Sequence, residues 1–132
     1  MRASRVVSPR VPEPPGGLFS NCLVAGNLVF LTGMTAAGPD GQPIGGDSME
    51  AQTRAVLTKI RDCLESAGGS LADVVRLVIY VTDMTRRAEV GKVRSEFFTS
   101  EPRPCSTMVE VKGFVAAGLL VEIEATAVLQ RA

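Results

Sequence analysis

Apolar residues recur at helical spacing between positions 49 and 67, and charged residues fill the other positions. Asp47 or Ser48 stands where a helix cap is expected, and Gly68-Gly69 stands where such a helix would end. This pattern predicts an amphipathic helix. Its apolar face is Met49, Thr53, Val56, Leu57, Ile60, Cys63, Leu64 and Ala67, and its polar face is Glu50, Arg54, Lys59, Arg61, Asp62 and Glu65.

Two strand patterns follow this helix along the chain. The run Val74–Val81 is β-branched and nearly all apolar, which favours a central strand covered on both faces. The segment from about Leu119 to Leu129 alternates, with apolar residues at odd positions and Glu122, Glu124 and Thr126 at even ones. It predicts a strand with one apolar and one polar face.

Shorter signals complete the order. Gly26-Asn27 separates apolar runs at about 19–25 and 28–32 and predicts a hairpin. Thr85 to Thr99 has helical character, and Ser106–Val111 follows two prolines as a strand. A short first strand is expected near Arg5–Ser8.

The predicted order is therefore β-β-α-β-α-β-β, an α+β fold. We expect one mixed sheet with both helices packed on a single face. The other face then carries the polar positions of the last strands and is only half apolar. A small sheet with such an uncovered face favours association with further copies of the chain.

Composition narrows the classes of function. A chain of 132 residues is expected to form one domain, spanning 1–132. Fourteen basic and fourteen acidic residues give zero net charge, so nucleic-acid binding by a basic face is not expected. No apolar run has signal-peptide or membrane-spanning length, which favours a cytoplasmic protein without membrane contact.

Histidine is absent, and the three cysteines, Cys22, Cys63 and Cys105, are widely spaced. A zinc site is therefore improbable, and free thiols are expected. Cys105 without a histidine partner favours a small buried residue over a nucleophile. Any chemistry must then rest on carboxylates, hydroxyls, backbone groups and bound water. Glu122 and Glu124, inside an apolar strand, must face solvent, a partner subunit or a pocket.

Several motifs, in order, cover nearly the whole chain. They are G-L-F-S-N-C at 17–22, A-G-N-L-V-F-L-T-G at 25–33, V-I-Y-V-T-D-M at 78–84, V-E-V at 109–111 and V-E-I-E-A at 121–125. Together they resemble the Rid family of reactive-intermediate deaminases, also called the YjgF/YER057c/UK114 family. The resemblance implies a chorismate-mutase-like fold and a homotrimer with a central barrel. It also implies a small-molecule ligand in each cleft between subunits.

Members with the full site hydrolyse enamines and imines to 2-oxo acids and ammonia, without metal or cofactor. The resemblance places the aromatic and serine of the family's G-x-Y-S stretch on Phe19 and Ser20. Phe19 lacks the hydroxyl of that aromatic residue. Gly33 matches the glycine that offers backbone groups to a ligand. Glu122 matches the first glutamate of E-I-E, the expected catalytic residue that orients water.

The family's carboxylate-binding arginine, three residues before V-E-V, falls on Ser106. Arg103 is the nearby arginine, and it either binds a carboxylate ligand or lies in solvent. Ser106 and Thr107 are the hydroxyls that replace the missing arginine, or are satisfied by backbone. A pocket asparagine becomes Gly91, and a cysteine becomes Met108. The chain is thus similar to a divergent branch of the family.

Several of these residues, and the function itself, have more than one interpretation. Glu122 either handles water or pairs with an arginine across subunits, and a structural salt bridge is favoured for Glu124. Phe19 is expected to form a pocket wall, and Tyr80 to place its hydroxyl at a rim. The function is either hydrolysis of small enamines or imines or capture of a 2-oxo acid without turnover. RNA cleavage or translation inhibition, a label of some relatives, fits the charge and the missing histidine least.

Overall fold

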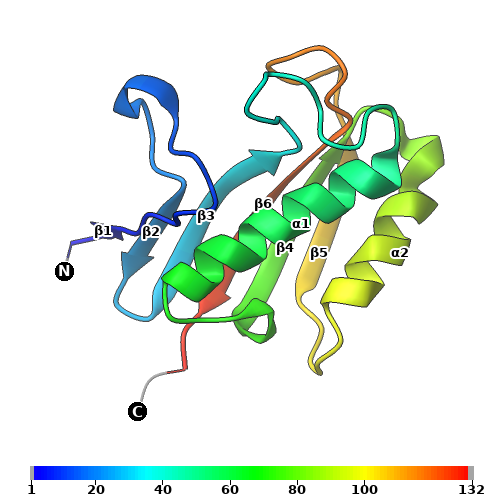
Figure 1. The fold of residues 1–132 in the computed structure, drawn as a ribbon. Helices are drawn as coiled ribbons and strands as arrows, with labels where there is room; N and C mark the ends of the chain where they lie inside the picture. The colour runs from blue at the N-terminus through cyan, green and yellow to red at the C-terminus, as the bar shows by residue number, and fades with distance from the viewer. Residues whose placement is uncertain (1, 131–132) are drawn as a thin grey trace.

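The computed structural model describes residues 2–130 and forms a six-stranded mixed sheet with two helices on one face (Figure 1). The order of strands across the sheet is β1-β2-β3-β6-β4-β5. The α+β fold predicted from the sequence is confirmed. The elements are β1 Ser4–Arg5, β2 Cys22–Ala25, β3 Leu28–Thr35, α1 Met49–Ser66, β4 Val74–Val81, α2 Arg87–Phe97, β5 Cys105–Glu110 and β6 Val121–Val128.

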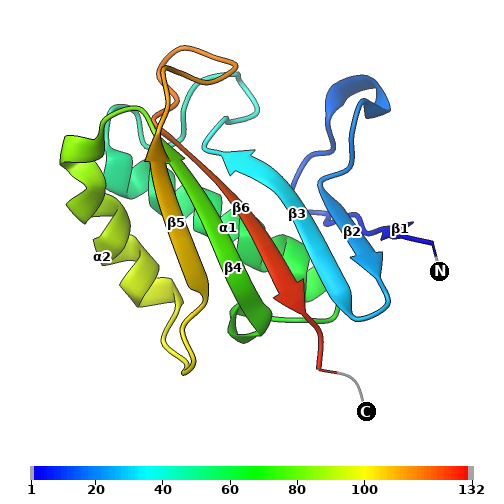
Figure 2. The same cartoon turned by 180° about the vertical axis from the view of Figure 1, so that it is seen from behind.

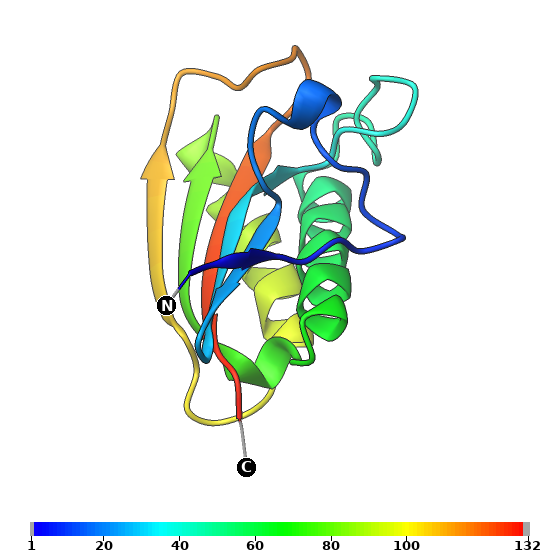
Figure 3. The ribbon, with the colours of Figure 1, turned by 90° about the vertical axis from the view of Figure 1, so that its left-hand side faces the viewer.

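The last strand lies in the middle of the sheet. β6 pairs antiparallel with β3 on one side and with β4 on the other. β4 and β5 are parallel and are joined by the crossover helix α2, as parallel neighbours require. Seen edge-on, both helices form a second layer against one face of the sheet (Figure 3). Seen from behind, the opposite face carries no helix (Figure 2).

The predicted hairpin is present, with Gly26 at a φ of 63° between β2 and β3. Glycine adopts this left-handed conformation without the steric cost that a side chain adds. β2 begins only at Cys22, later than predicted, because the preceding segment belongs to a proline-rich loop. The first strand is two residues long, Ser4–Arg5, and overlaps the predicted range by one residue.

Ser48 caps α1, and its hydroxyl accepts a hydrogen bond from the Ala51 N–H at 3.0 Å. The predicted apolar face is buried against the sheet from Met49 to Leu64. Asp62 is a correction, because its position on the polar face predicts exposure and it is only 8% exposed. Two arginines lie near its Oδ1 atom, Arg10 of the N-terminal loop at 3.6 Å and Arg61 at 3.9 Å, and neither is hydrogen-bonded to it.

Gln52 is a buried polar residue that the apolar pattern did not indicate. Its amide nitrogen donates to the carbonyls of Gly46 at 2.7 Å and Gly118 at 2.8 Å. Its side-chain oxygen accepts from the Leu120 N–H at 2.9 Å. One side chain therefore joins the loop before α1 to the loop before β6.

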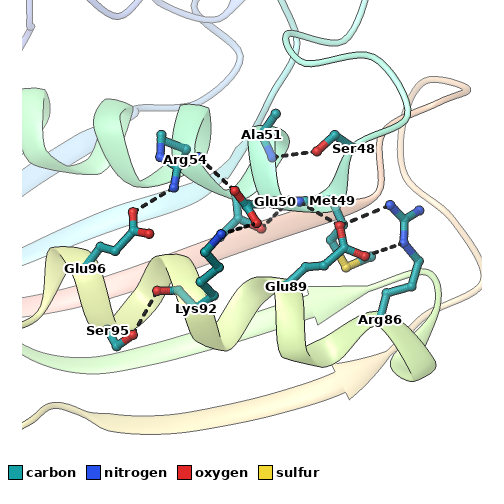
Figure 4. A network of polar contacts seen from close by, with 11 residues as sticks. Ser48, Met49, Glu50, Ala51, Arg54, Arg86, Glu89, Lys92, Ser95 and Glu96 are labelled. Carbon is teal, nitrogen blue, oxygen red and sulfur yellow. Dashed lines mark hydrogen bonds and ion pairs between the residues drawn. The ribbon is translucent and has the colours of Figure 1, made fainter.

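Charged side chains join the outer sides of α1 and α2 (Figure 4). Glu50 lies between Arg54 at 3.5 Å and Lys92 at 3.0 Å, and Arg54 also reaches Glu96 at 2.7 Å. Glu89 accepts the Glu50 backbone N–H at 3.2 Å. Each exposed pair contributes little alone, but the connected set fixes α2 beside α1.

The sheet face away from the helices, called here the open face, is only partly buried. On β4, Leu77, Ile79 and Val81 are buried beneath the helices, whereas Arg76 is exposed. Within one chain β4 is thus covered on one face, not on both as its composition indicated. Side chains of the open face include Phe30, Arg76, Val78, Tyr80, Thr107, Glu122, Glu124 and Thr126.

Candidate functional site

The carboxyl group of Glu122 lies directly against the backbone of β3 at Gly33. A Cβ atom built on Gly33 would come within 2.8 Å of Glu122 Cδ and 2.9 Å of Oε2. The β3–β6 register shifts between Leu31 and Met34, so Gly33 sits in an irregular part of the ladder. The absence of a side chain at position 33 is what leaves room for the carboxyl group.

Two effects raise the pKa of Glu122 above its usual range. Burial is the larger, and the nearby negative charge of Glu124 is the second. A carboxyl group with a raised pKa is a stronger base once ionised than an ordinary surface glutamate. The position therefore suits proton transfer to and from water.

Glu124 interacts with a hydroxyl, and not with the cation that a salt bridge requires. The Tyr80 hydroxyl donates to Glu124 Oε1 at 2.5 Å. Tyr80 pairs in register with Glu122, so the contact crosses the sheet diagonally. This hydrogen bond to the neutral phenol raises the pKa of Tyr80. Within residues 2–130, the salt bridge expected for Glu124 is not formed.

Phe19 and Ser20 lie beside the same part of β3. The Thr32 N–H donates to the carbonyl of Asn21 at 2.9 Å, which brings the segment before β2 next to Gly33. Ser20 accepts a hydrogen bond from Arg5 Nε at 3.0 Å. Phe19 is 53% exposed and does not pack in the core. The structure therefore places the segment that carries Phe19 and Ser20 beside β3, while Gly33 alone is seen in contact with Glu122.

A second group of residues lines an open cavity of about 430 Å³ between α2 and β5, called here the α2–β5 cavity. Ser106 lines this cavity, and its Oγ accepts a hydrogen bond from Arg94 Nη1 at 3.1 Å. Arg103 lines the same cavity, while its guanidinium lies 3.0 Å from the Glu101 carboxylate. The full lining is Gly91, Arg94, Ser95, Phe98, Arg103, Pro104, Ser106 and Met108.

Ser106 and Thr107 point to opposite sides of the sheet. Ser106 pairs with Leu77, which is buried beneath the helices, whereas Thr107 pairs with Val78 on the open face. Successive residues of a strand alternate in this way. The two hydroxyls therefore cannot both replace one arginine, and only Ser106 reaches the α2–β5 cavity.

The same alternation separates the two groups of candidate residues within one chain. Glu122 pairs with Tyr80 and faces the open side, whereas Ser106 faces the helical side on the far side of β4. A ligand of a few atoms cannot reach both groups within one chain. A site that uses both needs a second copy.

Arg94 is the residue that sequence reasoning missed. Gly91 and Arg94 share one face of α2, because they are three residues apart, and Phe98 follows directly after the helix end. The spacing indicates that face of the helix, but nothing in the sequence places that face against Ser106.

The prediction that Cys105 is buried is wrong, since Cys105 is exposed. Burial is the main cause that raises the pKa of Cys22 to about 11 and that of Cys63 to about 12, so these two thiols are poor nucleophiles.

Comparison with known proteins identifies the family. The sequence profile described as Endoribonuclease L-PSP matches residues 12–129. A RutC family protein of Pyrococcus horikoshii is 37% identical over 92% of this chain and 94% of its own length. The chain belongs to the Rid (YjgF) family.

Solved structures of the Rid family agree with this assignment. A member of the YjgF/YER057c/UK114 family from Mycobacterium tuberculosis is 38% identical, with a TM-score of 0.79 over 97% of this chain and all of its own. RidA from an Antarctic Psychrobacter is 29% identical, with a TM-score of 0.85 over 96% of this chain and 99% of its own. In residues 2–130 of this Rid chain, no helix has the length and apolar character needed to cross a membrane.

Proposed function

We propose that this Rid chain hydrolyses small enamines or imines to carbonyl compounds and ammonia, with Glu122 positioning the attacking water. The observation that carries the proposal is the half-buried Glu122 carboxyl held against Gly33. Its raised pKa suits a group that accepts a proton from water and later returns it. The chain belongs to the Rid family, and the resemblance to its deaminases at Glu122 and Gly33 supports this choice of reaction class.

The proposed steps balance with water as the only co-reactant. Glu122 takes a proton from water as the water oxygen bonds to the C=N carbon. The C=N π electrons move to nitrogen, which takes up a proton from solvent water, to give a tetrahedral amino alcohol; the alcohol proton lost in the last step returns that proton to solvent. Glu122 then returns its proton to the nitrogen, the C–N bond breaks, and the alcohol proton is released as the carbonyl forms. The products are a carbonyl compound and ammonia.

The complete site is proposed to form between copies of the chain in a homotrimer. Glu122 and Ser106 lie on opposite faces of one sheet, so they meet one ligand only if they come from different chains. The open face is partly exposed and half apolar, with Phe30 at 46% exposure, and it offers a surface for such contact. Analytical ultracentrifugation tests the oligomer, and a monomeric protein would remove this arrangement.

Ammonia release from freshly generated 2-iminopropanoate tests the activity. We expect Glu122→Gln to reduce the rate by about 100-fold or more, since general acid–base catalysis contributes about 100- to 10,000-fold. Glu65→Gln, at an exposed carboxylate on α1, is the matched control and should keep the wild-type rate. A rate that Glu122→Gln leaves unchanged would exclude Glu122 from the mechanism.

Capture of a 2-oxo acid without turnover is the second candidate. The observation that favours it is Ser106, which stands where the family pattern has its arginine on the strand. Under this function the protein binds the acid and releases no ammonia from the imine. The same assay, combined with a binding measurement, separates the two.

A further inference from the structure

Two arginines line the α2–β5 cavity, and their surroundings differ. Arg103 lies 3.0 Å from the Glu101 carboxylate, which already balances its charge, and its side chain is 51% exposed. Arg94 is partly buried and donates to the neutral hydroxyl of Ser106. Within residues 2–130 Arg94 has no carboxylate at ion-pair distance. The cavity thus contains one guanidinium whose positive charge is not paired with an acid.

Two small residues, Gly91 and Ser106, leave room for the Arg94 guanidinium between α2 and β5. A Cβ on Gly91 would lie 3.8 Å from Arg94 Nη2, in ordinary contact, so any longer side chain there would compete for the same volume. On the other side, the short side chain of Ser106 ends in the hydroxyl that accepts a hydrogen bond from Arg94 Nη1 at 3.1 Å. Gly91 and Ser106 together fit the arginine between helix and strand.

We propose that Arg94 is the carboxylate anchor of the α2–β5 cavity and that Ser106 is its positioning residue. A guanidinium has five N–H donors in a planar fork, and the bond to Ser106 occupies one of them. The remaining donors suit a carboxylate, which accepts two parallel hydrogen bonds. Helix α2 then supplies the cation that strand β5 lacks at position 106.

The cavity walls indicate the class of acid. Phe98, Pro104 and Met108 give an apolar lining beside the Arg94 guanidinium. A short monocarboxylate with a small apolar tail fits both features, and a 2-oxo acid or its imine belongs to this class. The inference rests on the proposed function, because it names the group that holds that reaction's substrate.

Binding of 2-oxobutanoate to the full-length protein, measured by isothermal titration calorimetry, tests Arg94 directly. We expect Arg94→Gln to weaken binding by about 10- to 100-fold, the loss typical of a charge-assisted hydrogen-bonded pair. Arg94→Lys keeps the charge but not the fork, and should bind with intermediate affinity. Arg87→Gln, at an exposed arginine of α2 that does not line the cavity, is the matched control and should bind as wild type. Arg103→Gln tests the competing anchor and should weaken binding less than Arg94→Gln does, because its charge is already paired.

Ser106 is tested by a pair of variants that differ in the hydroxyl. Ser106→Ala removes the acceptor of Arg94 Nη1, and we expect weaker 2-oxobutanoate binding, by about 3- to 10-fold, from a less fixed guanidinium. Ser106→Thr restores the hydroxyl and should recover the affinity. Equal losses in both variants would show that bulk at position 106 matters and would overturn the positioning role.

Inorganic phosphate separates a carboxylate site from a general anion site. We expect phosphate to compete with 2-oxobutanoate only weakly, since the apolar wall adds nothing to its binding. Arg94→Gln binding 2-oxobutanoate as tightly as wild type would overturn the inference, as would loss of binding in Arg103→Gln alone. Wild-type binding that depends on Arg94, without ammonia release from the imine, supports the anchor while rejecting the hydrolase.

Discussion

The carboxyl group of Glu122 occupies the place that a side chain at Gly33 would take, 2.8 Å from the position of its missing Cβ. Gly33 is not in the left-handed region, so alanine there meets no backbone strain. We expect Gly33→Ala to push the flexible end of Glu122 aside and to lower imine turnover by about 100-fold, as small misplacements of catalytic groups do. The unfolding free energy should change by less than about 1 kcal/mol.

Gly113→Ala is the matched control for this change, because nothing lies within 4 Å of its Cβ position. It should leave both turnover and urea unfolding as in the wild type. Full activity in Gly33→Ala would mean that the contact between positions 33 and 122 does not matter for turnover.

The raised pKa of Glu122 determines the direction in which the stability of the protein changes with pH. A carboxyl that binds its proton more tightly when folded contributes fully to stability below its unfolded pKa, near 4.3, and loses that contribution as pH rises through its folded pKa. Glu122→Gln should therefore gain stability over wild type at pH 7 and not at pH 4, in urea unfolding measured at both. A smaller gain is expected in a Glu124→Gln background, which removes the neighbouring charge. An equal effect at both pH values would contradict a raised pKa.

Tyr80 is the only tyrosine of the chain, so ultraviolet absorbance of tyrosinate reports on this residue alone. Its hydrogen bond to Glu124 favours the neutral phenol, and we expect a titration midpoint above the ordinary value near 10. Stability from this bond is present below pH 10 and is lost as pH rises through the raised pKa. Glu124→Gln should move the midpoint back toward 10.

Gln52 makes three hydrogen bonds to backbone groups of two loops. Gln52→Leu has similar volume but leaves the Gly46 and Gly118 carbonyls and the Leu120 N–H without this partner. We expect a loss of about 2–4 kcal/mol in unfolding free energy. Gln42→Ala, in an exposed loop, should change it by less than about 0.5 kcal/mol.

The sequence predicted those helices and strands whose apolar residues recur at a regular spacing. The apolar spacing of α1 and the alternation around Glu122 both reflect burial on one side, which the sequence records directly. The β-branched run predicted that β4 is a strand, but not that one of its faces is left open within the chain. Asp62 is buried although it stands among polar positions, and one of its two arginine neighbours, Arg10, lies more than fifty positions away, where no local pattern can indicate it. The exposure of Cys105 likewise depends on its place in an edge strand.

The candidate site was predictable on the Glu122 side and not on the other. Glu122 lies in the V-E-I-E-A motif and in a strand where apolar and polar residues alternate, so the sequence indicates both its expected role and the face of the sheet to which it points. Arg94 becomes a neighbour of Ser106 only through the packing of α2 on β5, across twelve positions of chain. An interaction between two elements of different periodicity leaves no repeat in the sequence.

The placement of Glu122 and Ser106 on opposite faces has a consequence for mixtures of defective proteins. If each site draws on two copies, a Glu122→Gln chain and an Arg94→Gln chain can complement one another. Unfolded together and refolded, they would form hetero-oligomers in which some crevices carry both substitutions and others carry neither. Ammonia release would then return in the mixture although each parent is defective, and a site built within single subunits could not be repaired in this way.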